Sequence, residues 1–252
     1  MIMGEFSGKI VLVTGGSKGI GAATVRRFCE EGAHCIIASR HLEECQSFAD
    51  ELQQAGFSAS ALAVDVSKVA EIKQMVGDVI DQFGKIDVLV NSAGVNNRKY
   101  AVDYVEEDWD YIMNINLKGA YFCTVEVGKE MLKQQKGAII SLSSLQSHIN
   151  MQRLSIYGAS KAGIRNFTKG LANEWATKGV RVNCVSPAFI ATPLVEKVLQ
   201  DPSYTTIIDS RTPMKRVGTP DEVANVILFL ASDKASYITG ADIAIDGGWT
   251  AS

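Results

Sequence analysis

The chain alternates short apolar runs with longer segments of helical spacing. The first run, Ile10–Thr14 (IVLVT), is almost wholly apolar, which is typical of a strand covered on both faces in a parallel sheet. Six further runs follow, at 35–39, 61–64, 86–91, 138–142, 180–185 and 243–246. Strands that alternate with helices in this way predict an α/β fold, a doubly wound Rossmann-type three-layer sandwich around a seven-stranded parallel sheet.

Between these runs lie the predicted helices. They cover 19–31, 42–55, 69–83, one or two helices within 106–135, then 155–177 and 220–231. Gly32 and Gly84 follow two of them directly, where a left-handed glycine commonly ends a helix. Thr219 is expected to cap the last helix, with Pro220 at its first position.

No Pro- or Gly-rich linker, low-complexity tract or charge block interrupts the 252 residues. We therefore expect a single domain over residues 1–252. The least periodic segment is 187–218, which holds four of the five prolines. Because long irregular segments of compact domains commonly cover active sites, we expect a substrate lid there.

Charge and composition exclude several classes of protein. With 46% hydrophobic and 21% charged residues, the chain resembles an ordinary globular protein. A net charge of −3 offers no general attraction for nucleic acid or an anionic membrane. Five cysteines without a CxxC pair or zinc spacing indicate reduced thiols and no metal site. With no leader pattern and no run of about 20 apolar residues, we expect a soluble cytoplasmic protein.

A glycine-rich segment, TGGSKGIG, joins the first strand to the first helix. Glycines at such a turn let the backbone approach a pyrophosphate, and the free amides of the helix N-terminus favour its charge. A tight turn without a ligand is the alternative reading of the segment alone. The candidate cofactor residues here are Gly15, Ser17, Lys18, Gly19, Ile20 and Gly21.

The end of the second strand indicates which nucleotide would bind. An acidic residue there would favour NAD(H) by bonding the ribose 2′-hydroxyl. This strand ends instead in Ser39 and Arg40, and Lys18 adds a second cation. Two cations with no carboxylate favour NADP(H), unless both are simply solvated surface charges.

Tyr157 and Lys161 form a YxxxK pair within a predicted helix, so both side chains share one face. A phenol with a pKa of about 10 must lose roughly three units, or roughly 4 kcal/mol, to exchange protons near neutrality. An ammonium at about 4 Å in an effective dielectric of about 20 supplies that amount. The pair could therefore handle a proton without a metal.

In their order along the chain, these motifs resemble the short-chain dehydrogenase/reductase family nearly from end to end. The resemblance rests on TGGSKGIG, Asp65-Val66, the NSAG segment at 91–94, Asn116 in NINLKG, Ser144 in ISLSS, Tyr157, Lys161, and the RVN strand that leads to Pro187. Ser144 stands thirteen residues before Tyr157, which matches the spacing of the family.

The resemblance implies a role for each matched residue. Tyr157 would exchange the substrate proton, Lys161 would lower its pKa and hold the nicotinamide ribose, and Ser144 would bind the carbonyl oxygen. Asn116 would hold a water in a proton relay. Further cofactor contacts are implied for Asp65 and Val66, for Asn91, Ala93 and Gly94, and for Pro187, Ile190 and Thr192. Family members are usually homotetramers.

Two positions depart from the family pattern. Ser92 replaces a second asparagine, and Ala188 replaces the glycine that commonly follows the proline. Since alanine tolerates a positive φ poorly, we expect a differently shaped start to the lid.

The residues near the expected carbonyl site are mainly polar, with one cation. Substrate contacts are predicted for Ser144, Gln146, His148, Arg98 and Tyr157, and they suit a sugar acid, keto-sugar or polyol. Arg98 and the closing DGGW segment resemble the gluconate and deoxygluconate dehydrogenase branch of the family. The alternatives are a 3-oxoacyl-[acyl-carrier-protein] reductase and, more remotely, a non-catalytic NADP-binding sensor. The first would use basic residues on two helices to dock its carrier, and this chain has Lys129 but Asn173 at those places.

Overall fold

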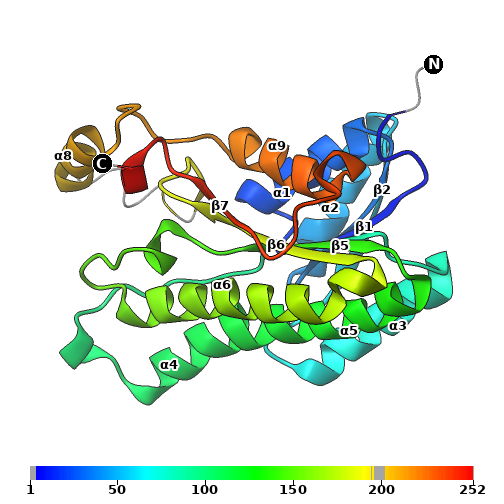
Figure 1. The fold of residues 1–252 in the computed structure, drawn as a ribbon, viewed down its shortest axis with the longest axis horizontal. Coiled ribbons are helices and arrows are strands. Elements are labelled where there is room, and N and C mark those ends of the chain that lie inside the picture. Colours follow the sequence, from blue (N-terminus) through cyan, green and yellow to red (C-terminus); the bar gives the residue numbers. More distant parts are fainter. Residues whose placement is uncertain (1–3, 194, 196–201, 252) are drawn as a thin grey trace.

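The computed structural model describes residues 4–193, 195 and 202–251. At its centre lies a seven-stranded parallel sheet with strand order β3-β2-β1-β4-β5-β6-β7, shown in Figure 1. The strands are β1 Ile10–Thr14, β2 His34–Ser39, β3 Ser58–Ala63, β4 Val88–Asn91, β5 Gly137–Leu142, β6 Val180–Pro187 and β7 Asp242–Ile245. The predicted fold class is confirmed.

Two helical layers cover the sheet (Figure 1). The helices are α1 Gly19–Glu30, α2 Leu42–Gln54, α3 Val69–Phe83, α4 Glu106–Met113, α5 Ala120–Gln134, α6 Ser155–Trp175, α8 Pro202–Arg211 and α9 Pro220–Ala231. Helices α1, α2 and α9 bury their apolar sides against one face of the sheet, and α3, α5 and α6 against the other. Alternate residues of the strands divide between these two cores, as in a sheet covered on both faces.

Strand boundaries differ from the predicted ones mainly at β3. This strand covers Ser58–Ala63, whereas the apolar run is 61–64. It forms one edge of the sheet and is only partly buried. Because an edge strand tolerates small polar residues such as Ser58 and Ser60, its start carries no apolar signal.

The helical stretch 106–135 is divided by a π-helical turn, Asn114–Gly119. Such turns frequently occur at functional sites. A Cβ on Gly119 would lie 2.7 Å from the carbonyl oxygen of Val66, so glycine lets this turn approach the loop after β3. The turn also contains Asn116, whose side chain it carries into the interior.

Helix α9 begins as its sequence predicts. The Thr219 hydroxyl accepts from the Glu222 backbone N–H at 3.3 Å, and the Glu222 carboxylate accepts from the Thr219 backbone N–H at 2.8 Å. The preceding segment 187–218 is less irregular than predicted, because α8 lies within it. Residues 194 and 196–201 of the expected lid lie outside the described residues.

Strand order reverses between β1 and β4. From β1 the chain builds one half of the sheet through β2 and β3, then returns to add β4 beside β1. At such a switch point the loops leave the carboxyl ends of neighbouring strands in opposite directions and open a crevice. All five cysteines are buried as free thiols, three on helices and two, Cys35 and Cys184, on strands β2 and β6. Among the described residues, no helix is long and apolar enough to cross a bilayer.

Candidate active site

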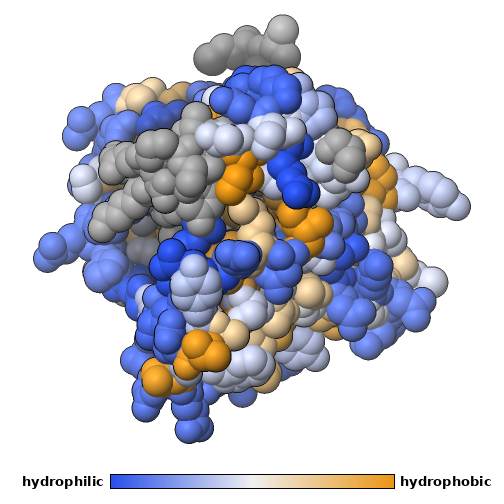
Figure 2. Space-filling model, turned by 90° about the vertical axis from the view of Figure 1, so that its left-hand side faces the viewer, coloured by the Kyte–Doolittle hydropathy of each residue, from blue (hydrophilic) through white to orange (hydrophobic). Residues whose placement is uncertain are grey.

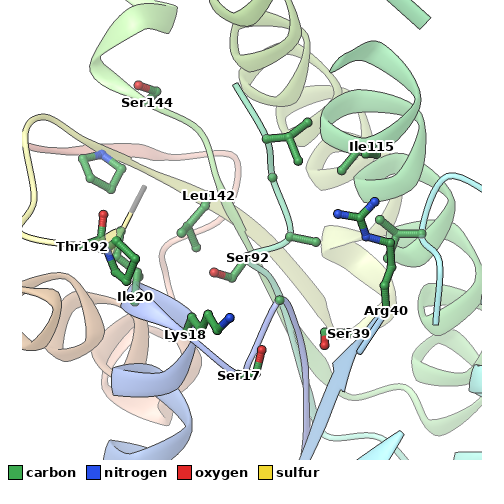
Figure 3. Close-up of a pocket in the computed structure, with 18 of the residues that line it drawn as sticks. Ser17, Lys18, Ile20, Ser39, Arg40, Ser92, Ile115, Leu142, Ser144 and Thr192 are labelled. Atoms are coloured by element: carbon green, nitrogen blue, oxygen red, sulfur yellow. The ribbon is translucent and has the colours of Figure 1, made fainter. Parts of the chain in front are cut away.

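A cavity of about 540 Å³ opens at the carboxyl ends of the strands. Its walls come from the loops that follow β1, β2, β3, β4, β5 and β6, and from α6. Figure 2 looks onto this end of the molecule and shows apolar side chains between hydrophilic ones. Inside, Ser144 lies toward one end and Ser39 and Arg40 toward the other (Figure 3).

The glycine loop forms the floor near β1. Gly15 and Gly19 have φ angles of +66° and +56°, which favour glycine. A Cβ on Gly15 would lie 2.7 Å from the Ala93 backbone, and one on Gly21 would lie 2.1 Å from the Gly15 carbonyl oxygen. Gly21 therefore permits close packing of the turn rather than lining the cavity. No side chain caps α1 at Lys18, which leaves its first amides available to an anion.

The end of the cavity near β2 contains both basic and acidic side chains. Ser39 and Arg40 line it, as predicted. Lys18 also lines it, but its Nζ lies 2.8 Å from the Glu44 carboxylate on α2. Asp65 lines the same end; burial acts to raise its pKa, but hydrogen bonds from Ser67 and then the charges of Lys68 and Arg40 lower it below its usual value. The end of β2 itself carries no acid, as the sequence indicates, but α2 and the loop after β3 bring Glu44 and Asp65 to the same end of the cavity.

Ser144, Tyr157 and Lys161 meet at the other end. Ser144 follows β5, where its hydroxyl accepts from the Gln146 backbone N–H at 3.2 Å and starts the short 3₁₀ turn Leu145–Ser147. Tyr157 and Lys161 lie one turn apart on α6. Lys161 Nζ donates to the Leu142 carbonyl oxygen at 2.7 Å and lies 5.7 Å from the centre of the Tyr157 ring.

Electrostatics at this end differ from the sequence-based expectation. Burial raises the pKa of Tyr157, and this effect exceeds the lowering by the Ser144 hydrogen bond and the Arg98 charge. Burial also lowers the pKa of Lys161 to about 8. The Lys161 ammonium donates to the Leu142 backbone carbonyl, and no lowering of the Tyr157 pKa by Lys161 accompanies the effect of burial. In this state the phenol carries its proton at neutral pH.

Asn116 is fully buried beneath this end of the cavity. Its Oδ1 accepts from the Val95 N–H at 2.8 Å, and its Nδ2 donates to the Val95 carbonyl at 2.9 Å and to Ser160 Oγ at 3.2 Å. Both amide hydrogens are thus used by the protein. Oδ1 and Lys161 Nζ each lie 3.5 Å from the place of a Cβ on Gly94, so they face one small space.

Three other predicted contacts turn away from the cavity. The Asn91 amide donates into the core, to Thr124 Oγ1 at 2.8 Å and Ser141 Oγ at 3.0 Å. Gln146 Oε1 accepts from the Met151 backbone N–H at 2.9 Å. His148 Nε2 lies 2.8 Å from the Asp242 carboxylate. Asn91 and Gln146 are therefore bonded within the protein interior, and His148 pairs with Asp242 while it remains partly exposed. None of the three side chains lines the cavity.

Arg98 lies beside the cavity rather than in its wall. Its charge reaches Tyr157 and acts to lower the pKa of the phenol. Its backbone carbonyl accepts from the Arg153 guanidinium at 3.2 Å. The loop 96–100 is fixed on its other side by Asp108, which accepts from Asn97 at 2.6 Å and from Lys99 at 2.6 Å. A cation is thus held close to the tyrosine.

Most other predicted cofactor residues do line the cavity. They are Gly15, Ser17, Lys18, Gly19, Ile20, Asp65, Val66, Ala93, Gly94, Pro187, Ile190 and Thr192. Sequence reasoning missed Glu44, His41, Ile115, Leu142, Pro193 and Val195. The first turn of α2 carried a usable signal, since a helix that begins just after a nucleotide-binding strand must point its first turn near that nucleotide.

The two departures from the family pattern cause little disturbance. Ser92 lines the cavity in place of an asparagine. Ala188 is not among the described residues with positive φ, and its N–H donates to the Ile245 carbonyl at 3.1 Å. The expected distortion at Ala188 was therefore wrong, because β6 continues its pairing with β7 through this residue.

A crevice of this kind at the switch point defines a dinucleotide-binding α/β protein. The family profile described as enoyl-(acyl carrier protein) reductase matches residues 15–250. The chain belongs to the short-chain dehydrogenase/reductase family, and it is an oxidoreductase of that family.

Individual relatives carry different activities in their names. The 3-oxoacyl-[acyl-carrier-protein] reductase FabG of Thermotoga maritima is 42% identical over 244 residues, which cover 97% of this chain and 98% of the relative. A tropinone reductase homolog of Arabidopsis thaliana is 36% identical, over 98% and 94% of the two chains. A gluconate 5-dehydrogenase from Burkholderia cenocepacia, solved with NADP and tartrate, is 30% identical with a TM-score of 0.96, over 98% and 97%. The family is common to all three, and the substrate is not.

Proposed function

We propose that this protein interconverts a secondary alcohol and a ketone on a small polar substrate, with NADP(H) as the hydride carrier. One observation carries the proposal. A single cavity has the glycine loop, Ser39 and Arg40 at one end and Ser144, Tyr157 and Lys161 at the other. This distribution suits an extended dinucleotide whose reactive end meets a proton-handling group.

The residues around the cavity fit the proposed cofactor. The uncapped start of α1 and the close turns at Gly15 and Gly21 suit a pyrophosphate. Arg40, Ser39 and Lys18 supply donors for a ribose 2′-phosphate. Asp65, Val66, Ala93 and Gly94 line the adenosine half, and Pro187, Ile190 and Thr192 the nicotinamide half. When bound, the nicotinamide supplies or accepts the hydride.

Three side chains handle the substrate oxygen. The Ser144 hydroxyl holds the carbonyl oxygen, and the Tyr157 phenol donates the proton that the new alcohol needs. Because burial keeps the phenol protonated at neutral pH, the site is prepared for ketone reduction in the described state. Lys161, with its pKa lowered to about 8, can replace that proton at little energetic cost.

A proton path leads from Lys161 toward Asn116. Lys161 Nζ and Asn116 Oδ1 both border the space above Gly94. The two hydrogens of the Asn116 amide are used by Val95 and Ser160, so a water here would donate to Oδ1. We assign Asn116 to this relay and to holding the Val95 backbone.

A hydroxylated acid is the substrate class that best suits the site. Arg98 places a positive charge near Tyr157, which would attract a carboxylate. The gluconate 5-dehydrogenase solved with NADP and tartrate supports this choice, since tartrate is a hydroxylated carboxylate. We expect the described part of segment 187–218, which includes α8, to cover the bound substrate. Gln146 and His148 are left out of the substrate contacts because their side chains bond to other protein groups.

A 3-oxoacyl-[acyl-carrier-protein] reductase is the second candidate. The 42% identity to the Thermotoga maritima enzyme favours it. Against it, the Lys129 ammonium lies 2.7 Å from Glu126, and Asn173 stands where a second basic residue would serve. A docking surface for an acidic carrier is therefore weak on these two helices.

A non-catalytic NADP-binding sensor is the third candidate. It would need the cofactor half of the cavity but no proton donor. This candidate is disfavoured, because the cavity also contains a proton-handling group made of Ser144, Tyr157 and Lys161. Absence of turnover with every substrate, together with tight NADPH binding, would favour the sensor.

The test is a spectrophotometric screen of purified protein with NADPH or NADP⁺. Sugar acids, keto-sugars, polyols and keto-acids are compared with acetoacetyl thioesters. We expect the highest kcat/KM for a hydroxylated carboxylic acid or its keto form. Faster turnover of acetoacetyl thioesters would replace this proposal with the carrier-protein reductase.

Assembly as a homotetramer, as is usual in the family, is part of the proposal. Tyr111 on α4 and Tyr121 on α5 are exposed, as are Phe229 on α9 and Tyr237 near β7. Exposed aromatic side chains on helices and near an edge strand are suited to burial between copies. Light scattering of the purified protein tests the mass.

A further inference from the structure

The carboxylate of Asp242 is buried at the start of β7, away from the cavity. Its side chain is only 7% exposed. Three groups from three other parts of the chain surround it. His148 Nε2 lies at 2.8 Å, Arg165 Nε at 2.6 Å, and Ser186 Oγ donates at 2.6 Å. Among the described residues that line the cavity, none of these four appears, so the cluster is separate from the cofactor and substrate contacts.

The cluster connects to the loop that carries Ser144. Arg165 Nη1 donates to the Ser147 carbonyl at 2.8 Å. Ser147 Oγ in turn donates to the Ser144 carbonyl at 2.7 Å and lies 3.4 Å from Ser186 Oγ. His148 directly follows the turn Leu145–Ser147. The turn after Ser144 is therefore held at several points by partners of one carboxylate.

The cluster also connects to the helix that carries Tyr157. Arg165 lies eight residues beyond Tyr157 on α6, with Lys161 between them. Residues at this spacing share one side of a helix. The same guanidinium thus fixes α6 to the turn after Ser144 and to β7. Arg165 therefore links the turn after Ser144 to the helix that carries Tyr157.

A buried carboxylate needs such partners, because desolvation of an uncompensated charge is costly. Cys184 of β6 also faces Asp242, and burial and then the Asp242 charge raise the pKa of that thiol. Once its partners are in place, a buried ionic cluster holds its elements in one geometry. Geometry matters here, because a displacement of about 1 Å can cost about a hundredfold in rate.

We propose that Asp242 is a positioning residue for the reaction: together with Arg165 and His148, its carboxylate fixes the turn after Ser144 relative to the helix that carries Tyr157. The inference rests on the proposed function, since it presumes that Ser144 and Tyr157 act on the substrate. It adds residues that touch neither substrate nor cofactor.

The first experiment is Asp242→Asn, which keeps the shape and removes the charge. We expect kcat to fall about tenfold or more, while the Kd for NADPH, measured by calorimetry, changes less than about twofold. The cofactor contacts come from other loops and are left intact. Asp87→Asn is the matched control. That carboxylate is also largely buried and bonds Lys9, Lys85 and the Ile10 N–H, but it lies before β4, at the opposite end of the sheet.

Asp87→Asn should lower the melting temperature and leave kcat unchanged. If Asp242→Asn does the same, Asp242 is a structural residue only and the inference is overturned. A second series covers the case that Asp242→Asn does not fold. His148 is 25% exposed, so its substitution disturbs packing less. His148→Leu should lower kcat without raising KM, and His148→Gln, which keeps a donor, should restore most of it. A rise in KM alone would make His148 a substrate contact and contradict the inference.

A Ser144→Ala background separates this inference from the proposed function. If Asp242 acts through Ser144, Asp242→Asn should lower kcat much less in Ser144→Ala than in the wild-type protein. The same factor in both backgrounds overturns the inference while leaving the proposed function intact. If Ser144→Ala itself turns over like the wild type, the proposed function fails first, and the inference fails with it.

Discussion

The Lys18 ammonium lies 2.8 Å from the Glu44 carboxylate at the edge of the cavity. Lys18 belongs to the glycine loop and Glu44 to the first turn of α2. Both side chains line the end where a ribose 2′-phosphate is proposed to bind. A 2′-phosphate and Glu44 must therefore compete for one cation, and the acid also repels the phosphate.

Replacing Glu44 by Gln should strengthen the binding of NADPH. Without the competing carboxylate, we expect the Kd for NADPH to fall roughly two- to fivefold, the modest size typical of an exposed ion pair. NADH, which has no 2′-phosphate, should bind as before. Calorimetry measures both. Glu43→Gln, one residue away and outside the cavity lining, is the control, and an equal gain there would mean a general charge effect.

Arg40 should account for most of the preference for NADPH. The wild-type protein should bind NADPH about tenfold or more tightly than NADH, and Arg40→Ala should remove most of this difference. Arg26→Ala removes a guanidinium that pairs with Glu51 outside the cavity and should leave the ratio unchanged. Equal affinities of the wild type for the two cofactors would contradict the assignment.

Tyr157→Phe should bind cofactor normally and lose turnover. Removal of the phenolic proton donor should reduce kcat by at least about a hundredfold. The ring and its packing remain, so the Kd for NADPH measures whether the cavity is intact. Tyr111→Phe, on α4 and outside the cavity, keeps the ring for any contact between copies and should retain full activity. Retained turnover in Tyr157→Phe would exclude the phenol as the proton donor.

Arg98→Ala should separate charged from neutral substrates. If the guanidinium attracts a carboxylate, KM should rise about tenfold or more for aldonates and much less for neutral polyols. Arg98→Lys keeps the positive charge and should retain part of the discrimination. Steady-state kinetics with one substrate of each kind tests this, and equal effects on both would count against a carboxylate site.

Lys161 should make stability depend on pH between about 8 and 10.5. Its pKa falls from 10.5 to about 8 on folding, so in this range the unfolded chain binds more protons. Stability therefore rises with pH through this range, and the buried ammonium destabilises the fold below it. Relative to Lys161→Met, the wild type should gain about 2 to 3 kcal/mol from pH 7 to pH 10 in urea unfolding.

Lys133→Met is the control for that measurement, because it removes an exposed ammonium whose side chain is 71% accessible. A wild-type and Lys161→Met pair with parallel pH profiles would show that Lys161 is not desolvated by folding.

Much of the sheet could be predicted because its central strands are continuous apolar runs. The run at Ile10–Thr14 is buried throughout, and burial on both faces is what such a run requires. The start of β3 was not predicted, because Ser58 and Ser60 lie on an edge strand of the sheet and give no apolar signal. The π-helical turn at Asn114–Gly119 was not predicted because its residues also suit an α-helix.

Many residues that line the cavity could be predicted from the sequence, but the directions of their pKa shifts could not. Spacing brings Tyr157 and Lys161 onto one face, but it gives no information on where the ammonium points. The Lys161 ammonium donates to the Leu142 carbonyl. Burial is the largest influence on the Tyr157 pKa and raises it. His148 shows the same limit, because its partner Asp242 lies 94 positions further along the chain. Long-range partners of this kind leave no local pattern.

The burial of every thiol has a practical consequence. Since Cys29, Cys35, Cys45, Cys123 and Cys184 are all enclosed, maleimide reagents should find no ready target on the native protein. A cysteine introduced at the exposed Ser210 of α8 would then carry a fluorophore at a single chosen point. A change in the emission of that dye when NADPH or substrate is added would then report a movement of α8.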